Sequence, residues 1–208
     1  MSTGKTFTLA LTGASGMAYA MRLLEQLLAE GHSVYLVYSQ AAQFVAVQEL
    51  SLTLPSKVSE ARKTLLEHYR CRPEQLQVFS RDDWMAPIAS GTGAADAMIV
   101  CPCTMGTLAA IAHGTSDNLI ERAADVMLKE GRKLILVPRE APFSAIHLEN
   151  MLKLSRLGVV MMAANPGFYH QPKRLEDLVD FMVAKILDQL GVDHQLMEKW
   201  GNVALPDD

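Results

Sequence analysis

Hydrophobic and polar residues alternate in blocks along the chain, and each block has the period of one kind of secondary structure. Short apolar runs rich in β-formers predict buried strands, and apolar residues spaced three or four apart predict amphipathic helices. The predicted strands are 7–12, 33–38, 77–80, 97–101, 133–137 and 159–163. The predicted helices are 16–30, 40–69 with a break at Pro55, 105–113, 118–129, one ending over 151–156, and 175–190.

Strands and helices alternate throughout this pattern, as they do in parallel sheets that carry helices on both faces. The sequence therefore predicts an α/β fold with a doubly wound, mostly parallel sheet, a Rossmann-like or flavodoxin-like three-layer sandwich. The 208 residues are enough for one generous core, so we expect a single domain over residues 1–208. Ligands of such sheets lie beyond the carboxyl ends of the strands.

The first predicted strand ends in a glycine-rich turn, Gly13-Ala-Ser-Gly16, that leads directly into a helix. The amides and the positive dipole end of a helix N-terminus favour a phosphate group. A dinucleotide site is disfavoured, because Ser15 and Ala18 stand where the fingerprint needs glycine and Ser39 where it needs an acid. The turn is not followed by Gly-Lys-Ser/Thr, so the sequence does not match a triphosphate-binding loop either.

Hydroxyl side chains at the ends of several predicted strands favour a mononucleotide such as FMN, whose single phosphate they can hold. The candidate donors are Ser15, Ser39, Thr104 and Thr107. An ordinary helix cap is the alternative for each of them, and for Thr107 taken alone we prefer that alternative. For the four residues together we favour a ligand.

Composition narrows the class of partner and the compartment. The formal charge is −4 and Lys and Arg form no run, so nucleic acid is not an expected partner. The sequence has an odd number of cysteines, Cys71, Cys101 and Cys103, and shows neither a signal peptide nor an apolar run of membrane-spanning length. We therefore expect a protein of the reducing cytoplasm.

Three long segments carry a family resemblance: TGASGMAYAMRLLEQL, CPCTMGTLAAIAHGTSDNLIERAADVMLKEGRKLILVPREAPFS and ANPGFYHQP. They resemble the UbiX flavin prenyltransferases of the flavin-binding decarboxylase-like superfamily, and the resemblance runs from Phe7 to about Asn202. Members of that family join a dimethylallyl group to N5 and C6 of reduced FMN, for use by UbiD-type decarboxylases. The resemblance implies this activity, in ubiquinone biosynthesis or a related decarboxylation, and a homo-oligomer, a dodecamer, with sites between subunits.

The resemblance also implies a set of site residues. For FMN they are Gly13, Ala14, Ser15, Ser39, Thr104, Met105, Gly106, Thr107 and Arg139. For the prenyl phosphate they are Tyr169 and Lys185, assisted by Arg122, Lys129 and Glu140. Each cation also has a plain structural alternative: a surface salt bridge for Arg139, a snorkelling lysine beside Leu178 for Lys185, and a solvated helix face for Arg122 and Lys129.

The implied reaction sets two further chemical requirements. A carboxylate must take the protons lost from flavin N5 and C6, and Glu49 and Glu140 are candidates with Ser15 as a bridge; we prefer Glu140. An aromatic wall must stabilise the allylic cation-like state, and Trp84, Trp200 and Tyr169 are candidates, although either tryptophan can simply be core or interface packing.

The substrate and the C-terminus complete the expectations. Asp82-Asp83 is followed by Trp84-Met85-Ala86 and so forms no DDxxD metal cluster, which favours dimethylallyl monophosphate and no metal. Residues from about 191 to 208 are expected to pack at a subunit interface.

Three other functions are weighed against a prenyltransferase. FMN-dependent cysteine decarboxylases share the fold, but they carry a His before the third strong strand and residues 87–93 contain none. A non-catalytic FMN-binding module needs neither Tyr169, Lys185 nor Glu140. A flavodoxin-like electron carrier is usually strongly acidic and needs no cationic pocket.

Overall fold

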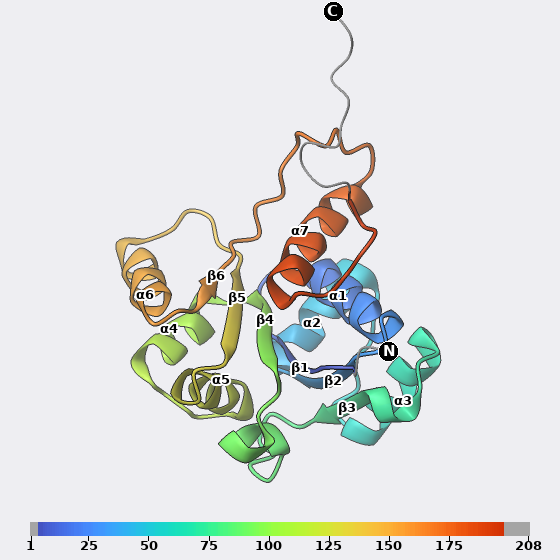
Figure 1. The fold of residues 1–208 in the computed structure, drawn as a ribbon, viewed down its shortest axis with the longest axis horizontal. Coiled ribbons are helices and arrows are strands. Elements are labelled where there is room, and N and C mark those ends of the chain that lie inside the picture. Colours follow the sequence, from blue (N-terminus) through green and yellow to red (C-terminus); the bar gives the residue numbers. More distant parts are fainter. Residues whose placement is uncertain (1–3, 198–208) are drawn as a thin grey trace, which may run out of the picture.

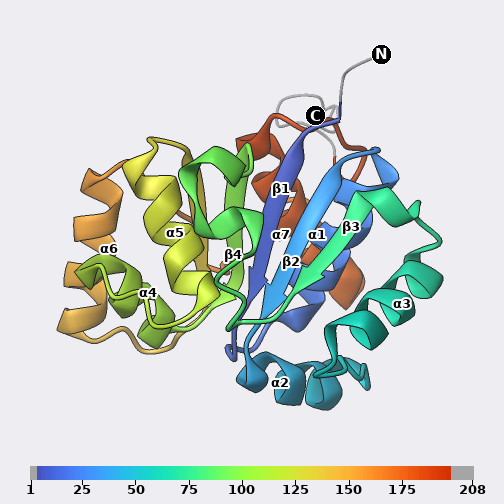
Figure 2. The same ribbon diagram turned by 90° about the horizontal axis from the view of Figure 1, so that it is seen from below.

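The computed structural model describes residues 4–197 and has a six-stranded parallel sheet between two layers of helices (Figures 1 and 2). The sheet order is β3-β2-β1-β4-β5-β6, and every neighbouring pair is parallel. The strands are β1 (Thr6–Leu11), β2 (Ser33–Tyr38), β3 (Leu76–Phe79), β4 (Ala97–Cys103), β5 (Lys133–Pro138) and β6 (Val160–Met161). The predicted doubly wound α/β fold is confirmed, and the sheet is wholly parallel.

The helices agree with the predicted pattern, and the segment 40–69 forms two helices separated at the predicted break. They are α1 (Met17–Ala29), α2 (Gln40–Leu50), α3 (Val58–Tyr69), α4 (Met105–His113), α5 (Leu119–Lys129), α6 (Ala145–Arg156) and α7 (Leu175–Leu190). Short 3-10 turns are η1 (Pro73–Gln75), η2 (Pro87–Ala89) and η3 (Gly91–Gly93). The residues around Pro55 separate α2 from α3, because proline cannot continue a helix.

Side chains of the strands point alternately into two hydrophobic cores, one on each face of the sheet. Leu9 and Leu11 of β1 pack in the core beneath α1, α3 and α7, whereas Ala10 packs in the core beneath α4, α5 and α6. The two faces explain why the central strands read as continuous apolar runs.

Two strands differ in length from their predictions. β4 passes through Pro102 to Cys103, where it pairs with Pro138 after a register shift beyond Val100. The Cys101–Pro102 peptide is cis, and Thr12 binds the carbonyl of Pro102 through both its amide (3.2 Å) and its hydroxyl (2.7 Å). β6 is assigned only two residues, although the chain stays beside β5 beyond it: the amides of Met162 and Ala164 donate to the carbonyls of Leu136 (2.9 Å) and Pro138 (3.0 Å).

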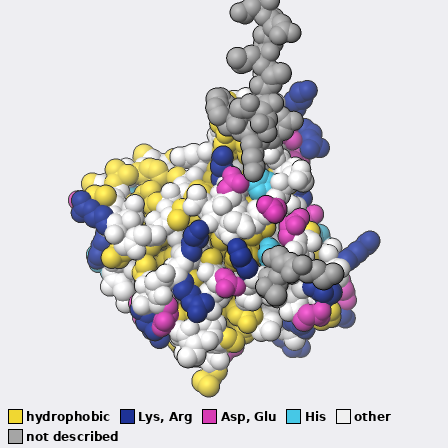
Figure 3. All heavy atoms as spheres, viewed as in Figure 1, with side chains coloured by type: hydrophobic (Ala, Val, Ile, Leu, Met, Phe, Trp, Pro, Cys, Tyr) yellow, Lys and Arg dark blue, Asp and Glu magenta, His cyan; other side chains and the backbone are white. Residues whose placement is uncertain are grey.

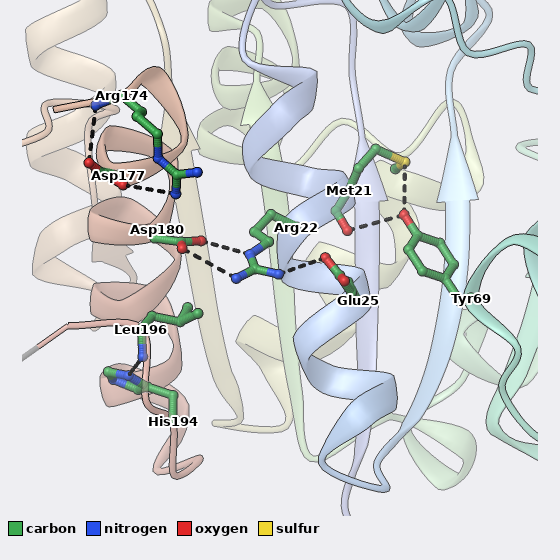
Figure 4. Close-up of polar contacts among 9 residues, drawn as sticks. All are labelled: Met21, Arg22, Glu25, Tyr69, Arg174, Asp177, Asp180, His194 and Leu196. Carbon is green, nitrogen blue, oxygen red and sulfur yellow. Dashed lines mark hydrogen bonds and ion pairs between the residues drawn. The ribbon is translucent and has the colours of Figure 1, made fainter. Parts of the chain in front are cut away.

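An ion pair attaches α7 to α1 (Figure 4). Arg22 Nε donates to Asp180 Oδ1 at 2.7 Å, and a second guanidinium nitrogen donates to Oδ2 at 3.2 Å. Glu25 accepts a further bond from Arg22 at 2.8 Å. The pKa of Arg22 is raised, chiefly by its hydrogen bond with Asp180. The pair is bidentate, so it fixes the direction of α7 across α1 as well as adding attraction.

The turn after β1 lies so close to α2 that only glycine fits at residue 13. A Cβ added to Gly13 lies 2.4 Å from the Cβ of Ala41, a distance that real side chains do not adopt. The first glycine of the motif is therefore required by packing between two segments of the fold, whatever the turn binds.

We predict that Gly13→Ala lowers the free energy of unfolding by about 1–3 kcal/mol, since the turn or α2 must move to admit the methyl group. Urea unfolding followed by circular dichroism measures the change. Gly106→Ala is the matched control, because a Cβ there meets no atom within 4 Å. Equal stabilities for the two variants would contradict the steric explanation.

Candidate functional site

A cavity of about 300 Å³ lies beyond the carboxyl ends of the central strands, at the edge that the sequence predicted. It is lined by Thr12, Gly13, Ser39, Ala41, Arg81, Thr104, Gly106, Thr107, Asn118, Ile120 and Glu121. The cavity thus brings together five of the residues expected to bind FMN, from the ends of β1, β2 and β4. This convergence follows from the parallel order of the sheet.

Three helices begin at this cavity, and each has a side-chain cap. Ser39 Oγ accepts from the amide of Ala42 at 3.1 Å, and Thr104 Oγ1 accepts from the amide of Thr107 at 3.2 Å. Asn118 Oδ1 accepts from the first-turn amides of α5 at 3.0 and 3.2 Å. The positive dipole ends of α2, α4 and α5 therefore face one space, which favours an anion there.

The hydroxyl groups at the cavity have donor capacity beyond their capping roles. Ser39 uses a lone pair of its oxygen as the cap and keeps its proton for another acceptor. The hydroxyl of Thr104 donates to that of Thr107 at 3.0 Å, which leaves the Thr107 proton to donate onward. Our preference for Thr107 as a cap is wrong, because Thr104 is the cap and Thr107 lies on the cavity wall.

The N-terminus of α1 is different, because a carboxylate already occupies it. Glu49, in the last turn of α2, accepts from the amide of Gly16 at 3.0 and 3.1 Å and from that of Met17 at 2.8 Å. The amides that the sequence left free for a phosphate are thus bonded to Glu49 in this structure. The helix N-termini that face an open cavity are those of α2, α4 and α5.

Ser15 and the two candidate carboxylates are arranged differently from our expectation. Ser15 is exposed and directly precedes Gly16, whose amide binds Glu49. Glu140 is half-buried after β5, two strands from β1 in the sheet order, and accepts from the amide of Ala141 at 3.2 Å. The structure thus places Glu49, and not the preferred Glu140, at the turn that carries Ser15.

Arg139 follows β5 and lies next to the end of β4, since its amide donates to the carbonyl of Cys103 at 3.4 Å. Its side chain is exposed. Within residues 4–197 its guanidinium forms no ion pair, so the surface salt bridge that we considered is not observed there. The two cysteines at the end of β4 are inert: burial raises the pKa of Cys101 to about 12 and that of Cys103 further.

Tyr169 and Lys185 come together against one aromatic ring. The Tyr169 ring meets the ring of Phe181 at a centroid distance of 5.6 Å, and Lys185 Nζ lies 5.8 Å from the same centroid. Half of the Tyr169 surface is exposed. The structure therefore joins the two residues that the family resemblance assigned to the prenyl phosphate, one from a loop and one from α7.

Arg122 and Lys129 share the outward face of α5 but lie at its two ends. Arg122 donates to the carbonyl of Ala89 at 3.0 Å and pairs with Asp125 at 2.9 Å. Lys129 pairs with Glu130 at the end of α5 where the chain turns toward β5, so it lies at the edge of the sheet opposite to the cavity. Within one chain the structure does not bring Lys129 to the site.

The structure describes the expected aromatic wall and the expected interface tail only in part. Trp84 is 49% exposed in the loop after β3. Trp200 and residues 198–208 of the expected interface tail lie outside the described residues. Residues 191–197 follow α7, and there Val192 is buried in the core.

Sequence reasoning missed Arg81, Asn118 and Glu121 as cavity residues. Arg81 is the one cation among the described residues that line the cavity, and its carbonyl accepts from the amide of Leu119 at 2.7 Å. Its position directly after a predicted strand was a usable signal, because the same rule identified Ser39 and Arg139. Asn118 was visible only as a helix start.

Metal and membrane features can be stated only for residues 4–197. In that part of the chain, no three His, Cys, Asp or Glu side chains are grouped as metal ligands. None of its helices combines the length and the hydropathy that crossing a membrane requires.

Comparison with known proteins gives the class of the chain. The Flavoprotein family model matches residues 1–187, so the chain belongs to the flavoproteins. The flavin prenyltransferase UbiX of Pseudomonas aeruginosa is 53% identical over 208 residues, all of both chains. The chain therefore belongs, within the flavoproteins, to the UbiX flavin prenyltransferase family.

Two solved structures agree with this assignment. The crystal structure of AnUbiX (PadA1) in complex with FMN and dimethylallyl pyrophosphate aligns with a TM-score of 0.86 and 37% identity, covering 97% of this chain and 100% of that one. A dodecameric FMN-dependent UbiX-like decarboxylase from Escherichia coli O157:H7 aligns with a TM-score of 0.81 and 40% identity, covering 91% and 96%.

We predict that Glu49→Gln lowers the free energy of unfolding by about 1 kcal/mol, because the α1 amides lose a charged acceptor and the dipole loses its counter-charge. Urea unfolding measures it. Glu67→Gln, in an exposed i,i+4 pair with Lys63 at 3.9 Å, is the control and should change stability by less than about 0.5 kcal/mol. Equal losses of unfolding free energy in the two variants would show that the Glu49 cap does not stabilise the fold.

Proposed function

We propose that this chain is a flavin prenyltransferase, which transfers a dimethylallyl group from dimethylallyl monophosphate to N5 and C6 of reduced FMN without a metal. The observation that carries the proposal is the cavity at which three helix N-termini and strand-end hydroxyls converge, in a chain 53% identical throughout to a UbiX enzyme. We also propose that residues 1–208 form one FMN-binding domain.

The residues present fit a flavin mononucleotide. Ser39, Thr107 and the first-turn amides of α2 and α4 would donate to its phosphate, with Arg81 as the counter-charge. Gly106 has no Cβ to fill the space beside that phosphate, and nothing lies within 4 Å of where one would be. When bound, reduced FMN supplies the nucleophilic N5 and C6.

Tyr169 and Lys185 would hold the phosphate of the prenyl donor and stabilise its negative charge as it leaves, with Arg139 as a further cation. Lys185 is half-buried against Phe181, so its charge is less screened than a surface charge. The exposed face of Tyr169 would lie along the prenyl chain and exclude water from the allylic cation-like state.

A carboxylate at the Ser15 turn would take the proton that leaves flavin N5. Glu49 is held at the turn by hydrogen bonds from two amides at 2.8 to 3.1 Å. Ser15 would bridge this carboxylate to the flavin, and Glu140, after β5, would serve the later proton from C6. This arrangement reverses the order of preference that we drew from the sequence.

Assembly of the chain would complete the site. Exposed apolar side chains gather over α6, as Figure 3 shows: Ile146, Leu148, Leu152 and Leu157. Exposed apolar patches of this kind mark protein interfaces. We propose a cytoplasmic homododecamer in which Arg122 and Lys129 of one subunit serve the prenyl phosphate site of another, and whose product passes to a UbiD-type decarboxylase.

Anaerobic incubation with reduced FMN and dimethylallyl monophosphate tests the proposed reaction. We expect mass spectrometry of the released flavin to show one added dimethylallyl unit, with or without a metal chelator. Dimethylallyl pyrophosphate in a parallel reaction tests the choice of donor, because the AnUbiX complex contains that compound. Unmodified flavin with both donors, under conditions where FMN is bound, would favour a non-catalytic FMN-binding module.

We predict that Tyr169→Phe and Lys185→Ala each raise the KM for the prenyl phosphate by about 10- to 100-fold, the loss of one hydrogen bond to a charged group. Their Kd for FMN should stay within about twofold, measured by flavin fluorescence.

Lys129→Ala tests the same substrate site from the neighbouring subunit. It should raise the KM in the assembled protein, although Lys129 lies far from the cavity of its own chain. Lys63→Ala, on the exposed surface of α3, is the matched control. For the Tyr169→Phe and Lys185→Ala variants, an equal loss of affinity for FMN and for the prenyl phosphate would contradict the division between FMN residues and prenyl phosphate residues.

A further inference from the structure

We propose that Phe181 is a positioning residue of the prenyl phosphate site, and that Gly167 is required by the same packing. The inference rests on the proposed function, since it concerns how Tyr169 and Lys185 are held. Phe181 was not among the residues expected from the sequence. It lies in α7, where it is 7% exposed and therefore has a fixed place in the fold.

The ring of Phe181 contacts Tyr169, Lys185 and His170. Tyr169 meets Phe181 edge to face, at 5.6 Å between centroids and 76° between planes. Lys185, one turn further along α7, has its Nζ 5.8 Å from the centroid of the same ring. His170 stacks on the ring at 5.0 Å and 18°. Edge-to-face and stacked contacts have preferred directions, so the ring sets orientation as well as distance.

The contact with Phe181 matters for Tyr169 because Tyr169 belongs to the irregular segment between β6 and α7. A side chain on such a segment depends on packing contacts for its position, whereas Lys185 is carried by a helix. The ring contact with Phe181 links Tyr169 to α7, and the Arg22–Asp180 ion pair holds α7 on α1. Tyr169 and Lys185 are thereby attached to α7, and α7 is attached to α1.

Gly167 lies close to the rings of both Phe181 and Tyr169. A Cβ added to Gly167 lies 3.0 Å from Phe181 Cζ and 3.0 Å from Tyr169 Cε1, both closer than ordinary van der Waals contact. Its φ is not in the left-handed region, so the restriction at residue 167 is the close approach of the two rings. An added methyl group requires the Tyr169 or Phe181 ring to shift by a few tenths of an ångström without altering the chemistry of either ring.

His170 contributes only its ring face to the cluster. Both ring nitrogens are inaccessible to solvent and have no hydrogen-bond partner in the described part of the chain. The imidazole lies against Phe181 on one side and meets the Tyr169 ring at 5.9 Å and 80°. It therefore packs against both rings of the Tyr169–Phe181 pair.

Two substitutions disturb the cluster by independent routes. Phe181→Leu keeps an apolar side chain in α7 but removes the ring, and Gly167→Ala keeps both rings but shifts at least one of them. In the assembled enzyme with reduced FMN, we expect each to raise the KM for dimethylallyl monophosphate by about tenfold or more, as misplacement of a binding group does. The Kd for FMN should change by less than about twofold. Met182→Leu, at the next buried residue of α7, is the matched control and should leave both constants unchanged.

Two further measurements separate positioning from general destabilisation. In a Tyr169→Phe/Lys185→Ala background, Phe181→Leu should raise the KM no further, because the groups that it positions are gone. A crystal structure of Phe181→Leu should show Tyr169 displaced from its wild-type place. Tyr169 and Lys185 unmoved in that structure, or equal KM effects for Phe181→Leu and Met182→Leu, would overturn the inference. The crystallographic result holds even if the wild-type enzyme transfers no prenyl group, so it distinguishes failure of this inference from failure of the proposed function.

Discussion

The contact between the turn after β1 and α2 is the constraint on which the rest of the site depends. Gly13 allows Ala41 to approach, and this brings the last turn of α2 over the start of α1, where Glu49 binds two amides. A negative charge already stands on α1, whereas the positive ends of α2, α4 and α5 face the cavity, so the cavity is the more favourable place for an anion. One close contact thus separates the Glu49 carboxylate from the cavity that we propose as the phosphate site.

The site has a second requirement, which is that α7 keeps its position against α1. The bidentate Arg22–Asp180 pair connects them, and buried Phe181 extends this connection to Tyr169 and Lys185. The proposed donor site is therefore built from the last helix of the chain, and the proposed FMN site from loops that begin at its first strand. Their relative position depends on the packing of α1 against α7 and not on any local sequence motif.

Much of the fold could be predicted because strand and helix periods are local properties. The helices and strands agree with the apolar pattern except where a local rule was overridden: β4 passes through Pro102, because Thr12 and a register shift accommodate it. Cavity residues at strand ends were predictable from the parallel topology. Arg81 follows the same rule but stands after a weakly patterned strand.

The sequence by itself determined the α/β class, the edge of the sheet that carries the site, and the family. These follow from residue spacing and from long motifs, which need no knowledge of distant contacts. Only the tertiary structure decided that Glu49 occupies the α1 amides, that Thr104 and not Thr107 is the cap, and that Tyr169 and Lys185 both lie against Phe181. Glu49 and Gly16 are 33 residues apart, and Tyr169 reaches Phe181 through a loop of irregular structure, so no periodicity connects them.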